Sequence, residues 1–200
     1  MIYRLLLFPC CLLLSHGMFS QQVNEQKTYT IYLNCPDSMV KAEVYYLNPG
    51  LKPAKDHFYA WYYNNMIHST EGGFNGKLLH GAYTCSYPNE TMKEQGEFKN
   101  GLKKGTWKKW YSSGVIAEIA YWDDGEKDGA YVLYGTSGKK ILEASYRNGK
   151  LHGTVTSYED GEVKMKREYK NGEEVKEKEK EKEKDRFSLG KIFGLGRRSN

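Results

Sequence analysis

Four glycines recur at a spacing of 24 residues along the middle of the chain. A bulky aromatic or β-branched residue stands two positions after each of them. The pairs are Gly81 and Tyr83, Gly105 and Trp107, Gly129 and Tyr131, and Gly153 and Val155. A fixed period of this length is the signature of a repeat array, in which each unit buries its apolar side chains mainly against its neighbours.

Each unit also ends on an aromatic residue, and a small residue usually stands two positions before it. These closing aromatics are Phe98, Trp122, Tyr146 and Tyr169, and the small residues are Gly96, Ala120 and Ala144. Counting back 24 residues from Tyr83 leads to Tyr59, inside a run rich in aromatics. We therefore predict five units across residues 57–172, the first of them degenerate.

Turn dipeptides separate the units and also divide them. Asn-Gly and Asp-Gly are the strongest short-range signals for a β-hairpin, because both central residues of a type I′ turn need a positive φ. Such dipeptides occur at Asn75-Gly76, Asn100-Gly101, Asp124-Gly125, Asn148-Gly149 and Asn171-Gly172. Further turns stand inside the units at Ser113-Gly114, Ser137-Gly138 and Asp160-Gly161. The pattern predicts strand, turn, strand and turn in each unit, whereas glycine recurs too often for a helix.

The phased glycines and aromatics resemble the MORN repeat, in the variant form common in bacterial exported proteins. The resemblance covers residues 57–172 and implies that successive hairpins add edge to edge. The expected fold is all-β: an elongated single-layer antiparallel sheet built from hairpin repeats of about 24 residues. Some relatives carry an antitoxin-like label, which gives one alternative for the function.

Composition agrees with a thin sheet. Only 39% of the residues are hydrophobic, and aromatic side chains alone account for 14% of the chain. So few aliphatic residues cannot fill a thick core between two layers. The net charge of +5 is mild and spread out, so we expect no nucleic acid partner.

The first twenty residues are typical of a secretory signal peptide. Arg4 supplies a positive charge, and ten uncharged, mostly apolar residues follow it. Ten residues are too few to span a bilayer, so we expect cleavage near Ser20 rather than a membrane anchor. The expected location is therefore the periplasm or cell envelope.

The segments on either side of the repeats have different expected roles. Residues 21–56 contain two predicted capping strands, at 28–33 and 42–47. Residues 173–200 form a Glu/Lys-rich tail, which we expect to be disordered or weakly helical, with an apolar and basic end suited to weak contact with an anionic membrane. Cys35 and Cys85 remain after signal cleavage, and either a disulfide or two free thiols fits the sequence.

Side chains alternate across a strand, so the aromatics divide between two faces. Tyr59, Tyr83, Trp107, Tyr131 and Val155 form one predicted column, which we interpret as the thin core. A second column faces the other way and is our candidate partner-binding surface. Its members are Tyr62, Trp110, Tyr134 and Tyr158.

No catalytic, metal-binding or cofactor-binding motif stands out in the sequence. We therefore expect a non-enzymatic protein without a cofactor. The leading prediction is a binding or scaffold module whose partner is another protein of the cell envelope. The alternatives are an antitoxin-like partner of a toxin, and a structural element held at the membrane by the tail.

Overall fold

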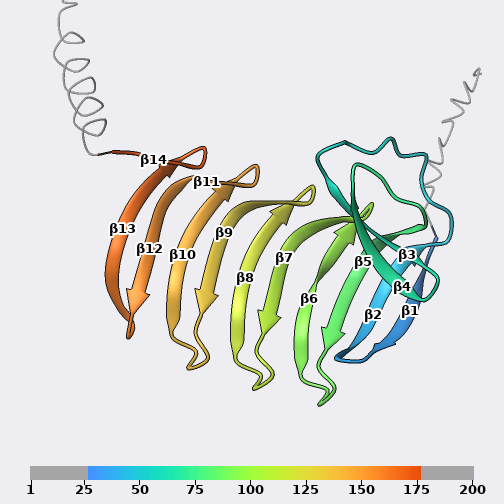
Figure 1. Cartoon of the computed structure of the whole chain (residues 1–200), viewed down its shortest axis with the longest axis horizontal. Coiled ribbons are helices and arrows are strands. Elements are labelled where there is room, and N and C mark those ends of the chain that lie inside the picture. Colours follow the sequence, from blue (N-terminus) through green and yellow to red (C-terminus); the bar gives the residue numbers. More distant parts are fainter. Residues whose placement is uncertain (1–26, 177–200) are drawn as a thin grey trace, which may run out of the picture.

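The computed structural model describes residues 27–176, which fold into one open antiparallel sheet of fourteen strands without a helix (Figure 1). The predicted signal peptide and the tail beyond residue 176 lie outside the described residues. The all-β, single-layer fold predicted from the repeats is confirmed, with consecutive hairpins laid side by side along the molecule.

Eleven strands follow one another along the main path of the sheet. They are β1 (Thr28–Cys35), β2 (Ser38–Tyr45), β5 (Lys77–Ser86), β6 (Met92–Lys99), β7 (Leu102–Trp110), β8 (Ile116–Asp123), β9 (Glu126–Tyr134), β10 (Lys140–Arg147), β12 (Gly153–Glu159), β13 (Glu162–Lys170) and β14 (Glu173–Glu174). Three strands lie off this path: β3 (Phe58–Tyr63), β4 (Met66–Glu71) and β11 (Lys150–Leu151).

Most of the predicted turns have the backbone that their residues favour. Both residues have positive φ in the turns at Asn100-Gly101, Asp124-Gly125, Asn148-Gly149 and Asn171-Gly172. Asn75-Gly76 is an exception, because neither residue has positive φ and the dipeptide lies in the connection between β4 and β5. A Cβ at Gly76 would lie 2.5 Å from the Tyr62 carbonyl oxygen, so this glycine permits a close approach of two chain segments.

The first predicted repeat unit does not lie beside the second one in the sheet. Its hairpin, β3–β4, pairs with the sheet only through Trp61 opposite Leu78 and Tyr62 opposite Lys77, and it crosses over the end of the sheet (Figure 1). Strand β2 occupies the position beside β5 instead. The prediction that Tyr59 continues the column of Tyr83 is therefore wrong.

The hairpin leaves the sheet path because aliphatic residues of β2 already complete the row beside β5. Val40 lies opposite Cys85, and Val44 lies opposite Leu79. Tyr59 is buried elsewhere, in a small cluster with Tyr45, Trp61 and Leu78. The predicted capping strands do exist, although β1 runs on to Cys35 and β2 starts at Ser38.

The repeated glycines produce irregularities in the strand pairing. Between β6 and β7 the register advances by two residues on β6, from Gln95 to Glu97, and by four residues on β7, from Lys108 to Lys104. Gly105 lies inside that bulge with a φ of 69°. Gly81 and Gly129 stand at the same kind of shift, with φ values of 100° and 129°. The 24-residue glycine period is thus a period of β-bulges, which bend and twist the strands.

Candidate partner-binding faces of the sheet

The main core lies on one face of the sheet, here called the Trp107 face. Its central row places large and small side chains on alternate strands: Tyr83, Gly96, Trp107, Ala120, Tyr131 and Ala144. Trp107 and Ala120 are almost wholly buried. The rings of Tyr83 and Trp107 lie 5.5 Å apart between centroids, although strand β6 separates them. The two rings meet over Gly96, where a Cβ would lie 2.2 Å from the Trp107 ring.

The closing aromatics of the units lie on this same face. Phe98 makes an edge-on contact with Trp107 at 4.9 Å between centroids, and Tyr146 meets Tyr131 in the same way at 5.6 Å. Tyr169 lies opposite Gly153 near the last strands and is half-buried. The repeat-defining residues thus lie in bulges or in the aromatic layer. They are Gly81, Tyr83, Gly105, Trp107, Gly129, Tyr131, Gly153, Phe98, Trp122, Tyr146 and Tyr169.

Two lysines at equivalent repeat positions cover the aromatic layer. Lys103 Nζ lies 3.7 Å from the centroid of Trp107 and 2.7 Å from a carboxylate oxygen of Glu94. Lys127 Nζ lies 4.0 Å from the centroid of Tyr131 and 5.2 Å from that of Tyr146. Burial lowers the pKa of both lysines. The protein's own cations therefore occupy the ring faces that are left open beyond the β3–β4 hairpin.

Burial also changes the pKa of the tyrosines in this layer. Burial raises the pKa of Tyr131 to about 12, and the nearby carboxylate of Glu118 acts in the same direction. The Tyr131 hydroxyl donates a hydrogen bond to Glu118 at 3.2 Å. Burial likewise raises the pKa of Tyr83 far above its ordinary value.

Three of the four predicted partner-binding residues lie on the opposite face, here called the Trp110 face. Trp110 and Tyr134 are the last residues of β7 and β9, and Tyr158 is the last but one of β12. All three side chains are half-buried. Ile116 lies opposite Trp110, and Lys140 lies opposite Tyr134. The three aromatics stand 24 residues apart, at equivalent positions of successive repeats, and so belong to one row across the sheet.

Tyr62 does not belong to that row. It lies in β3 and packs against the main core on the Trp107 face. The spacing of 24 residues would place Tyr62 in the same row as Trp110 only if the first unit followed the other hairpins along the sheet. The β3–β4 hairpin does not follow them. The predicted four-residue column is thus a three-residue row.

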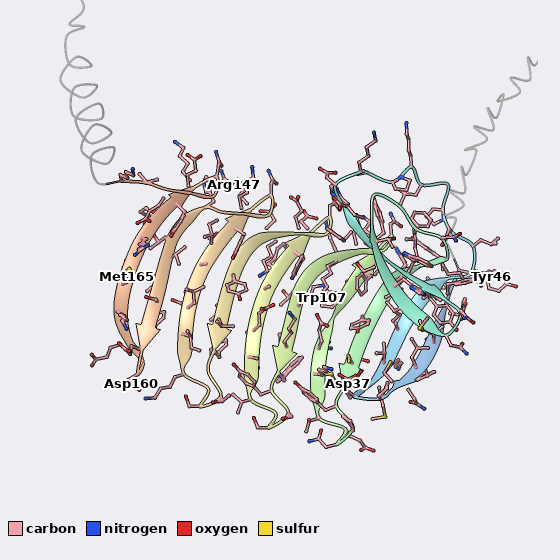
Figure 2. The ribbon with its side chains drawn as sticks, viewed as in Figure 1. Asp37, Tyr46, Trp107, Arg147, Asp160 and Met165 are labelled. Atoms are coloured by element: carbon pink, nitrogen blue, oxygen red, sulfur yellow. The ribbon has the colours of Figure 1, made fainter. Side chains whose placement is uncertain are left out.

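Further apolar side chains widen this row. Ile119 and Val132 lie opposite each other and are half-buried, and Tyr121 is 43% exposed. Side chains project from both sides of the ribbon, with Arg147 and Asp160 near the two opposite strand ends (Figure 2). Within residues 27–176, the β3–β4 hairpin contributes to the core of the Trp107 face, and no strand is laid across the row on the Trp110 face.

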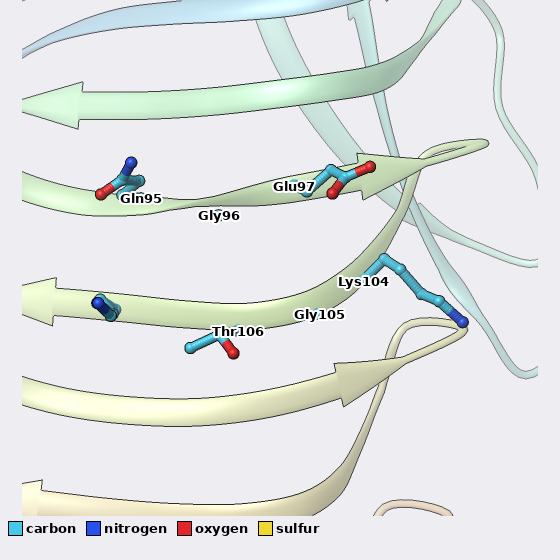
Figure 3. Close-up of a pocket in the computed structure, with 7 residues that line it drawn as sticks. Gln95, Gly96, Glu97, Lys104, Gly105 and Thr106 are labelled. Atoms are coloured by element: carbon cyan, nitrogen blue, oxygen red, sulfur yellow. The ribbon is translucent and has the colours of Figure 1, made fainter.

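A polar hollow of about 350 Å³ lies beside the bulge at Gly105 (Figure 3). Its lining residues are Gln95, Gly96, Glu97, Lys104, Gly105, Thr106 and Lys108. A Cβ at Gly105 would have nothing within 4 Å, so the missing side chain itself opens part of this space. Lys104 forms an ion pair with Asp123, which leaves a shallow depression of mixed charge rather than a chemical site.

Two tyrosines fasten neighbouring repeats, a role that the sequence did not predict. The Tyr87 hydroxyl donates a hydrogen bond to the Trp110 carbonyl oxygen at 2.9 Å, and the Tyr111 hydroxyl donates one to the Tyr134 carbonyl oxygen at 2.8 Å. Both acceptors belong to residues of the candidate row. The next equivalent position along the chain is Gly135, which has no hydroxyl.

Cys35 and Cys85 are free thiols in the structure. Strand β2 lies between β1, which carries Cys35, and β5, which carries Cys85. Two strand spacings amount to about 9–10 Å, beyond the roughly 7 Å that a disulfide can bridge between Cα atoms. Of the two options that the sequence left open, the structure has the unpaired one.

Residues 27–176 contain no cluster of three or more His, Cys, Asp or Glu side chains suited to a metal ion. The described part of the chain also has no helix that is long and apolar enough to cross a membrane.

Comparison with known families gives a match over two adjacent repeats. Residues 79–100 and 103–124 match the MORN repeat variant. These stretches contain all but the first one or two residues of the β5–β6 and β7–β8 hairpins, so each matched unit corresponds to one hairpin of the sheet. Proteins with MORN repeats are commonly binding or scaffold modules and generally not enzymes. A comparison with curated proteins finds no match.

Proposed function

We propose that this protein is an exported, non-enzymatic binding module of the cell envelope, and that its partner is another protein, which docks on the Trp110 face. The observation that carries the proposal is the row of Trp110, Tyr134 and Tyr158, whose side chains are half-buried and belong to neither buried core cluster. Aromatic residues of this kind dominate the binding energy of protein interfaces.

The Trp107 face is less suited to a partner because its rings already have neighbours. The β3–β4 hairpin packs against one end of that face through Ala60 and Ile67. Farther along the sheet, Lys103 and Lys127 lie over the rings and bring their own charges. A partner would have to displace two lysines to reach the aromatic layer there. No equivalent displacement is needed at Trp110 or Tyr134.

The sheet beneath the row is well fixed. The backbone of Trp110 and of Tyr134 is held from the preceding repeat by the hydroxyls of Tyr87 and Tyr111. A partner therefore meets side chains that are already positioned, which lowers the entropy lost on binding. This arrangement suits a scaffold better than an enzyme, which needs a concave site with reactive groups.

Affinity capture tests the proposal. Tagged full chain is incubated with the envelope fraction of its own source, and the eluate is identified by mass spectrometry. We expect one envelope protein in near-stoichiometric amount, and at least tenfold lower recovery with the double variant Trp110→Ser, Tyr134→Ser. Its circular dichroism should match that of the wild type, because both side chains lie outside the buried core clusters.

The matched control is Tyr63→Ser with Met66→Ser, which removes two apolar side chains, 59% and 54% exposed, from the β3–β4 hairpin. This control should capture the partner as the wild type does. Equal recovery with both double variants would contradict docking on the Trp110 face.

The same experiment separates the alternatives. A captured protein that arrests growth when produced alone would point to the antitoxin-like function. A chain ending at Lys176 keeps β14 and removes the rest of the tail. Loss of membrane lipid, but not of protein, from its eluate would assign membrane contact to the tail.

A further inference from the structure

The two ends of the open sheet differ sharply in charge. Strand β13, near the C-terminal end, has six charged residues among nine: Glu162, Lys164, Lys166, Arg167, Glu168 and Lys170. The short strand β14 also pairs with the last residues of β13. Charged side chains and short outer strands are the usual means by which a protein prevents another strand from adding to its edge.

Strand β1, at the other end, has no such protection. Its eight residues, Thr28–Cys35, include no charged side chain and are rich in β-branched and aromatic residues. Within residues 27–176 it pairs with β2 alone, so its outer backbone groups have no strand partner. A long, uncharged edge strand of this kind is a template for strand addition.

We propose that β1 pairs antiparallel with β1 of a second copy of this chain, about a twofold axis, so that two sheets join into one. The absence of charge on the strand points to a second copy. Antiparallel pairing about a twofold axis needs a self-complementary strand. An uncharged strand meets that condition because no residue opposes a like charge. A strand with a charge at a fixed position would instead favour a partner of the opposite sign.

The alternation of side chains fixes how the strands can align. Ile31 and Leu33 lie on the Trp107 face and are buried in the main core, whereas Tyr32 lies on the other face and is 72% exposed. Residues directly opposite each other in an antiparallel pair lie on the same face. Placing Tyr32 opposite Tyr32 of the second copy therefore also places Ile31 opposite Leu33, and the two cores become continuous.

This alignment gives the exposed tyrosine a partner of the favoured kind. Aromatic pairs directly across two strands are among the stabilising cross-strand contacts. Pro36 has no backbone N–H and limits the paired segment to residues 29–35. The inference is independent of the docking face, because the Trp110 row lies several strands away from β1.

The first test is the mass of the full chain in solution, by sedimentation velocity in reducing buffer across the micromolar range. We expect twice the mass of one chain. Thr30→Lys with Tyr32→Lys places two charges on exposed positions of the edge and should raise the dissociation constant at least tenfold. The control Tyr121→Lys alters an exposed tyrosine in the interior strand β8 and should leave the dimer intact. A monomeric wild type, or a dimer that persists unchanged in the double lysine variant, would overturn the proposal.

The second test addresses the alignment. Tyr32→Cys, made together with Cys35→Ser, should form an intermolecular disulfide on mild oxidation, seen as a dimer on a non-reducing gel. The matched protein with Tyr121→Cys and Cys35→Ser should remain a single chain on the same gel. Failure of the Tyr32→Cys protein to cross-link, while its mass in solution is that of a dimer, would rule out the pairing of Tyr32 with Tyr32.

Discussion

At the scale of single residues, the absence of a side chain determines where the largest side chains lie. Gly96 leaves room on β6 for the Trp107 ring, and Ala120 does the same on β8. Gly105 has a different role, because its φ of 69° is a conformation that L-residues with a Cβ adopt at a cost. Two glycines nine residues apart are therefore required for different physical reasons.

Alanine substitutions separate these reasons. Gly96→Ala should lower the free energy of unfolding by about 2–3 kcal/mol, because its Cβ overlaps the Trp107 ring. Gly105→Ala should lower it by about 1 kcal/mol, since space is free and only the backbone is strained. Urea unfolding measures both values. Gly135→Ala, with ordinary φ and its nearest contact at 3.4 Å, is the control and should stay within about 0.5 kcal/mol of the wild type. An unchanged free energy of unfolding in Gly96→Ala would mean that the Tyr83 and Trp107 rings do not meet over β6.

The buried tyrosines make stability fall at alkaline pH. The pKa of Tyr131 is about 12 in the folded chain against 10.0 for an unperturbed tyrosine, so the folded state holds this proton more tightly. The stabilisation is complete below pH 10 and is lost as the pH rises toward about 12. Tyr131→Phe should therefore show a shallower loss of stability over this range than the wild type does.

Denaturant midpoints measured from neutral pH to pH 12 check this prediction. Burial lowers the pKa of Lys103, which makes stability rise with pH instead of falling. This contribution is common to both proteins, so it cancels when their pH curves are compared. Parallel pH curves for Tyr131→Phe and the wild type would show that Tyr131 ionises equally easily in the folded and unfolded chains.

At the scale of elements, each hairpin is joined to the next by contacts that recur with the repeat. In four turns between repeats the glycine N–H donates to a carbonyl of the preceding repeat. Gly125 donates to Lys103 at 3.0 Å and Gly149 to Lys127 at 2.9 Å, and Gly101 and Gly172 make the equivalent bonds. The tyrosine hydroxyls of Tyr87 and Tyr111 add a second link at the opposite strand ends. The repeats are thus fastened at both ends of their strands.

Removing one hydroxyl tests the second link. Tyr111→Phe and Tyr87→Phe should each lower the free energy of unfolding by about 0.5–1.5 kcal/mol, because a backbone carbonyl loses its donor. The two losses should add in the double variant, since the two bonds lie in different repeats. Tyr63→Phe alters an exposed tyrosine and serves as the control in the same urea titration. Losses no larger than that of the control would mean that water replaces these bonds without cost.

The sequence predicted the elements whose residues repeat in phase. Type I′ turns follow from the φ preferences of Asn and Gly, and the aromatic layer follows from strand alternation. The course of the β3–β4 hairpin could not be predicted, because Tyr59 and Tyr62 keep the 24-residue spacing while β2 takes the place beside β5. The lysines over the rings were also missed, since Lys103 and Lys127 look like exposed charges until the positions of the Trp107 and Tyr131 rings are known.

At the scale of the whole molecule, the sheet is a linear array without a central core. Its buried cluster lies at the N-terminal end, where β3–β4 covers β2 and β5, and the later repeats depend on a layer of aromatics and lysine stems. Stability in such an array is the sum of the units and of the contacts between neighbours. The Trp110 row extends through the part of the array without a covering hairpin.

Deleting one whole unit should therefore leave a folded protein. Removal of residues 125–148 joins Asp124 to Gly149 and restores an Asp-Gly turn in phase. We expect one cooperative urea transition whose m-value is lower by roughly a sixth, in line with the smaller surface exposed on unfolding. Removal of residues 125–136 alone deletes a strand, reverses the direction of all later strands and should give an unfolded C-terminal half. Equal behaviour of the two deletions would contradict a modular array.

Hydroxyl-radical footprinting of the protein alone and in the captured complex tests whether the partner docks on the Trp110 face. We expect Trp110, Tyr134 and Tyr158 to lose reactivity in the complex, while Tyr131 and Tyr146 on the other face are unchanged. Protection of Tyr131 and Tyr146 with unchanged reactivity at Trp110 would place the partner on the Trp107 face and contradict the proposed docking surface.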